Sequence, residues 1–134
     1  MTVVDAGVVV TALSDDGGVG RQVRQRLLRD GDLHAPEMLD VEVTAALRRL
    51  VVIERKLTIK RAEQALRDLM DLPLTRWSHL PLVWRAWGLR ENVRPYDGMY
   101  VALTEALGAV LLTGDATLAR SPGVRCQVEV LSGP

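Results

Sequence analysis

The amino-acid sequence predicts an α/β fold in which a short parallel sheet is covered by helices on both faces. Short apolar runs of strand length alternate with longer segments of helical periodicity along the chain. The run Ala109-Val110-Leu111-Leu112 is apolar throughout, as is typical of a strand buried on both faces. With 134 residues, 48% of them hydrophobic and 25% charged, we expect one domain, residues 1–134, with a substantial core.

In the N-terminal half, residues 1–4 form a β-branched run that predicts a strand ending at Asp5, and a short helix is predicted to start directly after Asp5 and to include the apolar run over 8–13. An arginine-rich amphipathic helix is predicted over 19–29, and a brief strand over 33–35. The longest predicted helix runs from Pro36 to about Arg55. Thr58 is suited to cap the next helix, over 59–70.

The C-terminal half continues the alternation. A third short strand is predicted over 74–77, and a helix opens at Ser78 or His79 and runs to Leu89. Pro95 suits the first position of another helix, which continues at helical spacing to Leu107 and ends at Gly108. The apolar run over 109–112 follows as a strand, and a last strand is predicted over 127–131.

Composition excludes several classes of protein. No apolar run is long enough to span a bilayer, and Asp5 interrupts the apolar stretch at the N-terminus, so neither a membrane anchor nor a signal peptide is expected. The single cysteine, Cys126, excludes an internal disulfide and a multi-cysteine metal site, and we expect a cytoplasmic protein. Neither a dinucleotide-binding G-x-G-x-x-G nor a phosphate-binding P-loop motif is present.

The formal charge is zero, with seventeen basic and seventeen acidic residues. This balance argues mildly against binding nucleic acid by bulk charge, although acidic residues gathered in one pocket would leave the remaining surface positive. The basic set at positions 48, 49, 55, 56, 60 and 61 is either a solvated helix face or a contact for a phosphate backbone.

Acidic residues mark the most informative positions. Asp5 and Asp115 each follow an apolar strand, and in an open parallel sheet the functional crevice lies beyond the carboxyl ends of the strands. Asp97 lies in the first turn of the helix from Pro95, and either Glu42 or Asp40 faces the same way from the long helix. Converging carboxylates repel one another unless a cation is present, and Mg²⁺ and Mn²⁺ prefer oxygen ligands. The pattern therefore favours a metal site.

Each acidic residue also has a purely structural interpretation. Asp5 and Asp115 are suited to cap the segments that follow them, and Asp97 complements a helix dipole. Glu42 and Asp40 lie near opposite edges of the apolar stripe of their helix, so helix geometry does not choose between them.

Other notable side chains point less clearly to a site. We interpret His34 and His79 as core or capping residues rather than ligands, and Cys126 as a small buried residue. The three tryptophans, at positions 77, 84 and 87, are expected in the core or in a subunit interface.

Three segments, MTVVDAGVVV, PEMLDVEVTAALRR and YDGMYVALTEALGAVLLTGDATLA, resemble PIN-domain ribonucleases, specifically the VapC toxins of bacterial type II toxin–antitoxin (VapBC) systems. The resemblance covers nearly the whole chain in the same order and spacing. It implies a PIN-like three-layer α/β/α fold with strand order 3-2-1-4-5 and Mg²⁺- or Mn²⁺-dependent cleavage of RNA. The family's acidic set falls on Asp5, Glu42, Asp97 and Asp115, which selects Glu42 over Asp40. Thr113 matches a small hydroxyl residue that often precedes the last aspartate.

The resemblance also implies a chemistry and partners. Asp5 and Asp97 would bind the metal directly, while Glu42 and Asp115 would bind through water, hold a second ion or orient the nucleophile. An activated water would attack the phosphodiester and leave 5′-phosphate and 3′-hydroxyl ends. A VapB-type antitoxin would cover the crevice with its C-terminal segment, and the toxin would form a homodimer.

Two departures from the family pattern and two alternatives remain. Gly7 stands where the family commonly has serine, which affects a hydroxyl contact near the metal, and Gly98 stands where it often has alanine. One alternative is a degenerate PIN fold that only binds a partner, which loss of an acidic position would favour, but all four are present. The other is a phosphate-accepting receiver domain, which would need a lysine after a late strand, and none follows Lys60.

Overall fold

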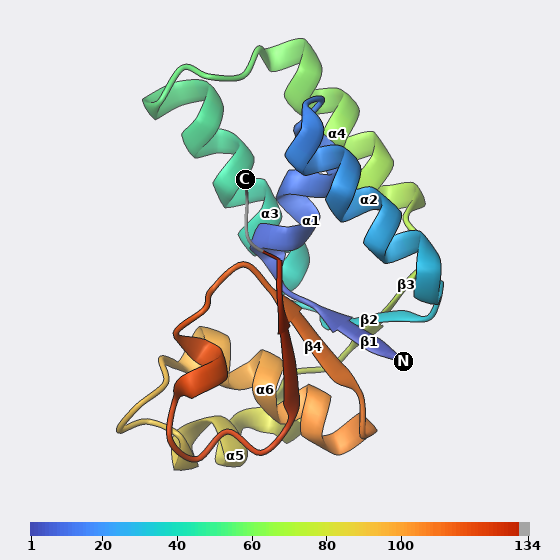
Figure 1. The fold of residues 1–134 in the computed structure, drawn as a ribbon. Coiled ribbons are helices and arrows are strands. Elements are labelled where there is room, and N and C mark those ends of the chain that lie inside the picture. Colours follow the sequence, from blue (N-terminus) through green and yellow to red (C-terminus); the bar gives the residue numbers. More distant parts are fainter. Residues whose placement is uncertain (132–134) are drawn as a thin grey trace.

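The computed structural model describes residues 1–131, whose strands form one five-stranded sheet (Figure 1). The strands are β1 (Thr2–Val4), β2 (Leu33–Pro36), β3 (Leu74–Trp77), β4 (Val110–Thr113) and β5 (Gln127–Val130). The α-helices are α1 (Ala6–Ser14), α2 (Gly18–Asp30), α3 (Leu39–Arg48), α4 (Ile59–Asp71), α5 (Val83–Gly88) and α6 (Pro95–Leu107). A π-helix covers Arg49–Ile53, and short 3-10 helices cover Leu80–Leu82 and Leu118–Arg120.

The strand order is β3-β2-β1-β4-β5 and every pairing is parallel, which confirms the expected α/β class and the order 3-2-1-4-5. The chain order reverses between β1 and β4, where Val4 pairs with Leu112. Asp5, which directly follows β1, therefore lies beside Thr113, the last residue of β4, at the carboxyl ends of two central strands. This is the edge at which open parallel sheets bind their ligands.

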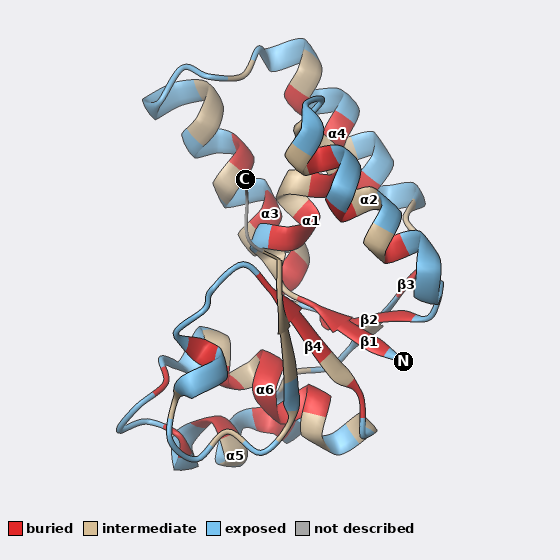
Figure 2. Cartoon of the chain, viewed as in Figure 1, coloured by how far each residue is buried: buried red, intermediate tan, exposed pale blue. Residues whose placement is uncertain are grey.

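Helices cover the sheet on both faces (Figure 1). Helices α1 to α4 gather on one side, with α1 packed against α2, α3 and α4, while α6 lies across β1, β2 and β4 on the other side with α5 packed outside it. Figure 2 shows the central strands β1, β2 and β4 mostly buried between these layers, whereas the edge strands β3 and β5 are partly exposed, as are the outer helix surfaces. Within residues 1–131, none of the helices combines the length and the hydropathy needed to cross a membrane.

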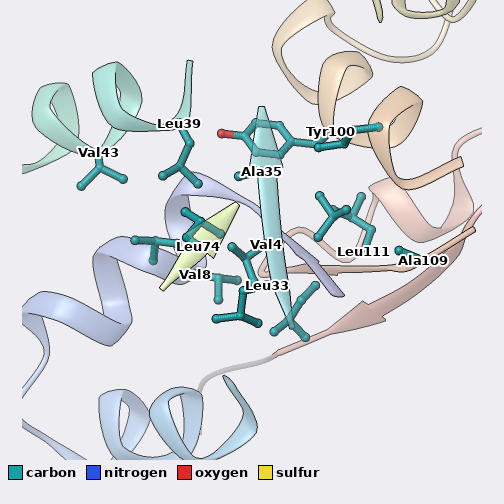
Figure 3. Close-up of a cluster of buried hydrophobic side chains, with 14 of the residues drawn as sticks. Val4, Val8, Leu33, Ala35, Leu39, Val43, Leu74, Tyr100, Ala109 and Leu111 are labelled. Carbon is teal, nitrogen blue, oxygen red and sulfur yellow. The ribbon is translucent and has the colours of Figure 1, made fainter. Parts of the chain in front are cut away.

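The core fills both interfaces between sheet and helices (Figure 3). Val4 and Leu111 from the central strands, Leu39 and Val43 from α3, and Tyr100 from α6 are all buried. Figure 3 shows Tyr100 reaching past β2 with its hydroxyl directed toward the α3 side. Each fully buried apolar side chain contributes about 1.5–3 kcal/mol to stability, so the sheet edge that carries Asp5 rests on a well-packed base.

The helix predicted from Pro36 to about Arg55 differs from the observed helix at both ends. Pro36 pairs with Trp77 as the last residue of β2 rather than opening a helix, because a proline is tolerated at a strand end as well as in a first helical turn. The regular helix ends at Arg48 and continues as a π-helix through Val51, Val52 and Ile53. These consecutive β-branched residues have restricted side chains in an α-helix.

Gly98 has a packing role that explains one departure from the family pattern. It lies in α6 opposite Ala86 of α5, and a Cβ atom at position 98 would approach the Ala86 Cβ to 3.1 Å and its Cα to 3.2 Å. Glycine therefore lets α5 and α6 approach closely, one residue from Asp97. By contrast, a Cβ at Gly7 would meet only the Asp5 Oδ1 atom, at an ordinary contact distance of 3.6 Å.

His34 is structural, as expected, but His79 is only partly buried and its side chain makes no capping hydrogen bond within the described residues, and none of the three tryptophans is in the core. His34 is buried on β2, with Nε2 2.8 Å from the Asp32 carboxylate and Nδ1 accepting a hydrogen bond from the Trp77 indole. Trp77, Trp84 and Trp87 expose 39%, 82% and 56% of their surface. The core interpretation is therefore wrong for all three, whereas the interface interpretation stays a prediction.

Candidate active site

Asp5 stands at the centre of the candidate site, where β1 ends and α1 begins. Its Oδ1 atom accepts a hydrogen bond from the Val8 N–H at 2.9 Å, so it does cap α1, and its Oδ2 atom accepts one from the Thr113 hydroxyl. Burial raises the pKa of Asp5, the two hydrogen bonds oppose that rise, and the negative charge of Asp115 adds to it. The capping role involves only Oδ1 and therefore does not explain why Thr113 also binds Oδ2.

Thr113 connects two of the predicted aspartates. This fully buried last residue of β4 donates its hydroxyl hydrogen to Asp5, and its oxygen accepts the Asp115 N–H at 3.0 Å. The Asp115 carboxylate accepts hydrogen bonds from the Thr117 N–H and hydroxyl, at 2.9 and 2.6 Å. These contacts, together with Arg94, hold the pKa of Asp115 below its usual range, so this exposed residue is a fixed anion at the rim.

The structure separates Glu42 from Asp40, which helix geometry had left equivalent. The Glu42 carboxylate accepts a hydrogen bond from the Tyr100 hydroxyl at 2.7 Å and faces α6. Burial raises the pKa of Glu42, Tyr100 opposes the rise, and Asp97 and Asp5 increase it. Asp40 instead pairs with the Arg76 guanidinium at 2.8 Å, toward β3. Glu42 is therefore the α3 carboxylate on the side of Asp5 and Asp97.

Asp97 completes the set from the first turn of α6. Burial raises its pKa, and the charges of Asp115 and then Asp5 raise it further, while Arg94 opposes them. No side-chain hydrogen bond to Asp97 is found in the described part of the chain. Its carboxylate is thus held near other anions without a neutralising partner bound to it, as expected for a group that binds a cation.

The four sequence-predicted residues gather at one edge of the sheet from four different segments: the β1 end, α3, the α6 start and the β4 end. The raised pKa values of Asp5, Glu42 and Asp97 share one first cause, burial. Repulsion between carboxylates adds to it, because Asp115 raises the pKa of both aspartates and Asp5 raises the pKa of Glu42 and Asp97. Because ionisation of these three carboxylates is disfavoured, a positive charge at the site would stabilise their ionised forms.

The donor set fits a hard divalent cation. All four side chains offer carboxylate oxygens, the ligands that Mg²⁺ and Mn²⁺ prefer. Within residues 1–131, no three histidine, cysteine or acidic side chains lie close enough together to enclose an ion by themselves. Mg²⁺ does not require such a cage, because it typically binds one or two carboxylates and keeps several waters. An open, water-rich arrangement is therefore the kind of site that these residues fit.

Two contributors to the site were not predicted. Tyr100 holds Glu42, and Arg94 acts on both Asp97 and Asp115. A signal for Tyr100 was available, because it follows Asp97 by three residues and so lies on the same face of its helix. Arg94 directly precedes α6, and no sequence pattern at that position indicates that its charge acts on the site.

The comparisons with known proteins agree with this geometry. Residues 2–123 match the family model described as PIN domain, and the chain therefore belongs to the PIN-domain family. Within it, the chain is 42% identical over 130 residues to Ribonuclease VapC1 of Mycobacterium tuberculosis, covering 96% of both chains. It is 37% identical over 131 residues to Ribonuclease VapC9 of the same species, covering 98% of both. These similarities place it among the VapC ribonucleases.

Solved structures show the same fold at low sequence identity. A VapBC2 structure from Rickettsia felis, bound to a promoter DNA fragment, matches with a TM-score of 0.68 at 12% identity, covering 96% of this chain and 97% of that one. Mycobacterium tuberculosis VapC20, described as a Sarcin-Ricin loop cleaving toxin, matches with a TM-score of 0.66 at 15% identity, covering 93% and 99%.

Proposed function

We propose that this chain is an endoribonuclease that hydrolyses RNA phosphodiesters with Mg²⁺ or Mn²⁺ held by Asp5, Glu42, Asp97 and Asp115, and that it is the toxin of a toxin–antitoxin pair. One observation carries the proposal: Asp5, Glu42 and Asp97 are partly buried at the switch point of the sheet, where burial raises the pKa of each and the charge of Asp5 raises the pKa of Glu42 and of Asp97 further. A degenerate binding module would not need this costly arrangement. The names of the VapC relatives support RNA as the substrate.

The surroundings of each residue suggest its role in the proposed reaction. Asp5 and Asp97 are the direct ligands in this proposal, because burial and the charge of Asp115 raise the pKa of both carboxylates. Thr113 fixes the orientation of Asp5, and Tyr100 fixes that of Glu42. A bound Mg²⁺ or Mn²⁺ would supply a water of lowered pKa and neutralise charge developing on the phosphate oxygens. Glu42 and Asp115 would orient that water or hold a second ion, and the products would carry 5′-phosphate and 3′-hydroxyl ends.

We propose that a VapB-type antitoxin controls this activity, since structures with the same fold include VapBC complexes from Rickettsia felis and Salmonella typhimurium. A homodimer is part of the proposal. An apolar patch on and beside α5 supports it, comprising Leu80 and Trp84, which are mostly exposed, and Trp87 and Val83, which are partly exposed. We propose that residues 1–134 work as one domain in the cytoplasm, which suits an RNA substrate and the free thiol of Cys126.

The test compares cleavage of a structured RNA by the wild type, Asp97→Asn, Glu42→Gln and Asp40→Asn, with Mg²⁺ or Mn²⁺ and with EDTA. Asp97→Asn and Glu42→Gln should lose cleavage, because a neutral amide is a poorer partner for a hard cation than a carboxylate. Asp40→Asn should retain it, because Asp40 pairs with Arg76 outside the site. Growth arrest on expression should follow the same order. Equal cleavage by all variants, or in EDTA, would contradict the proposal.

A further inference from the structure

A cleft of about 530 Å³ opens directly beside the candidate site, between α1 and α3. Glu42 lines one end of it, so the cleft and the acidic site share a side chain. Gly7 and Ala45 contribute to its walls, and a side chain at Gly7 would find no closer neighbour than Asp5 Oδ1. These small residues therefore leave room for part of an extended substrate next to the carboxylates.

The far end of the cleft is basic. Arg48 and Arg49 line it, and both side chains are exposed, with 66% of the Arg49 side chain accessible. The Arg49 guanidinium has only a loose ion pair, at 3.5 Å from the Glu54 carboxylate. An arginine held this loosely at the surface is free to bind a phosphate with its planar fork of donors.

Helix geometry aligns the acidic and basic ends. Glu42, Ala45, Ala46 and Arg49 follow one another at i, i+3, i+4 and i+7, which places them along one face of the helix that continues from α3. Seven residues span about 10 Å at the rise of an α-helix. Arg49 therefore lies further along the cleft from Glu42, in line with a phosphate that neighbours the one held at Glu42 on the same strand.

We infer that this cleft is a substrate subsite, in which Arg49, assisted by Arg48, binds the RNA backbone next to the phosphate that is cut. The inference rests on the proposed function and names positioning residues for it. Phosphates suit the cleft because its basic end is opposite in charge to them, whereas its mostly small lining residues offer little to anchor large apolar side chains of a peptide. The adjoining cleft, which Arg49 also lines, carries both Lys56 and the acidic residues Asp15 and Asp16, so its charge is mixed and the basic character is concentrated at Arg48 and Arg49.

The experiment measures binding of a short, fluorescently labelled single-stranded RNA of mixed sequence in EDTA, over a range of salt concentrations. The test variant is the full chain with Arg48→Ala and Arg49→Ala. The matched control carries Arg21→Ala and Arg67→Ala, which remove the same charge from exposed positions of α2 and α4 outside the cleft. A further variant places lysine at positions 48 and 49 and keeps both charges. Thermal unfolding checks that all four proteins are folded.

The test variant should bind the RNA about tenfold more weakly at low salt, as expected when bonds to a charged group are lost. The slope of log affinity against log salt should decrease by about 1.4, since each contact with a single strand contributes about 0.7. The control should bind nearly as the wild type does. The lysine variant should keep the salt slope of the wild type, because both charges remain, but should bind somewhat more weakly, because an ammonium group lacks the planar fork of arginine.

Equal affinities and slopes for the test variant and the control, whether both fall or neither does, would overturn the inference. Because binding is measured in EDTA, it does not depend on metal chemistry. A wild type that binds RNA through these arginines but never cleaves it would instead count against the proposed function, so the two failures are distinguishable.

Discussion

Thr113→Val should destabilise the protein in a way that depends on pH. Valine keeps the shape of threonine but removes the hydroxyl that donates to Asp5 and accepts from the Asp115 N–H. A hydrogen bond to a charged group contributes about 1.5–3 kcal/mol and a neutral one about 1 kcal/mol. Burial of the extra methyl group returns about 0.8 kcal/mol. The expected loss in the free energy of unfolding at neutral pH is therefore about 2–3 kcal/mol.

The sign of the pH dependence follows from Asp5. The Thr113 hydroxyl lowers the pKa of Asp5 against the rise caused by burial, so its removal raises the folded-state pKa further. Ionisation of Asp5 then costs the folded variant more than the folded wild type. The destabilisation should be small where Asp5 is protonated and should grow as pH rises through the folded-state pKa.

Thr104→Val is the matched control. Thr104 is equally buried, but its hydroxyl donates only to the Tyr100 carbonyl of its own helix, at 2.7 Å. That bond leaves no charged partner behind when it is lost. Urea unfolding in EDTA at about pH 4 and about pH 7 measures both variants. A loss for Thr113→Val that is the same at both pH values, or no greater than that of Thr104→Val, would refute the role given to Thr113.

Three further predictions concern packing, charge and assembly. Gly7→Ala should stabilise the protein by about 0.5–1 kcal/mol, because position 7 is an open helical site. Gly98→Ala should instead lower the melting temperature, because its Cβ would press on Ala86. A stabilised Gly98→Ala protein would disprove the close-packing argument. In EDTA, the stability of Asp97→Asn relative to the wild type should increase from about pH 4 to about pH 7, because the folded-state pKa of Asp97 is raised and its ionisation opposes folding. Urea unfolding measures the difference in stability. A difference that is the same at both pH values would show that burial of the ionised Asp97 does not destabilise the fold. Replacing Trp84 and Trp87 by serine should shift sedimentation from dimer to monomer without unfolding, and an unchanged dimer would place the interface elsewhere.

Much of the fold was predictable because its signals are local. Apolar runs that end in aspartate identified β1 and β4, and the alternation with helices identified the parallel sheet. The strand order came from the resemblance to PIN domains, since the pairing of β1 with β4 joins residues more than a hundred positions apart. Local sequence patterns do not indicate which distant strands pair with each other.

The choice between Glu42 and Asp40 shows where sequence reasoning from a single helix stops. Both lie at the border of the same apolar stripe, and only the neighbours across the fold distinguish them. Arg76 of β3 neutralises Asp40, while Tyr100 of α6 holds Glu42. Trp84 shows the same limit in another form, because helical periodicity marks an apolar face without telling whether the protein's own core or a second molecule covers it.

The central claim is that the carboxylates bind a divalent cation. Titration calorimetry of Mn²⁺ into the metal-free wild type, Asp97→Asn and Asp71→Asn tests it most directly. Asp71 is an exposed carboxylate at the end of α4, outside the site, so Asp71→Asn controls for the lost charge. We predict that the wild type and Asp71→Asn bind Mn²⁺ with the same affinity and that Asp97→Asn binds it at least tenfold more weakly. Equal affinities in all three proteins, or no binding by the wild type, would contradict the claim.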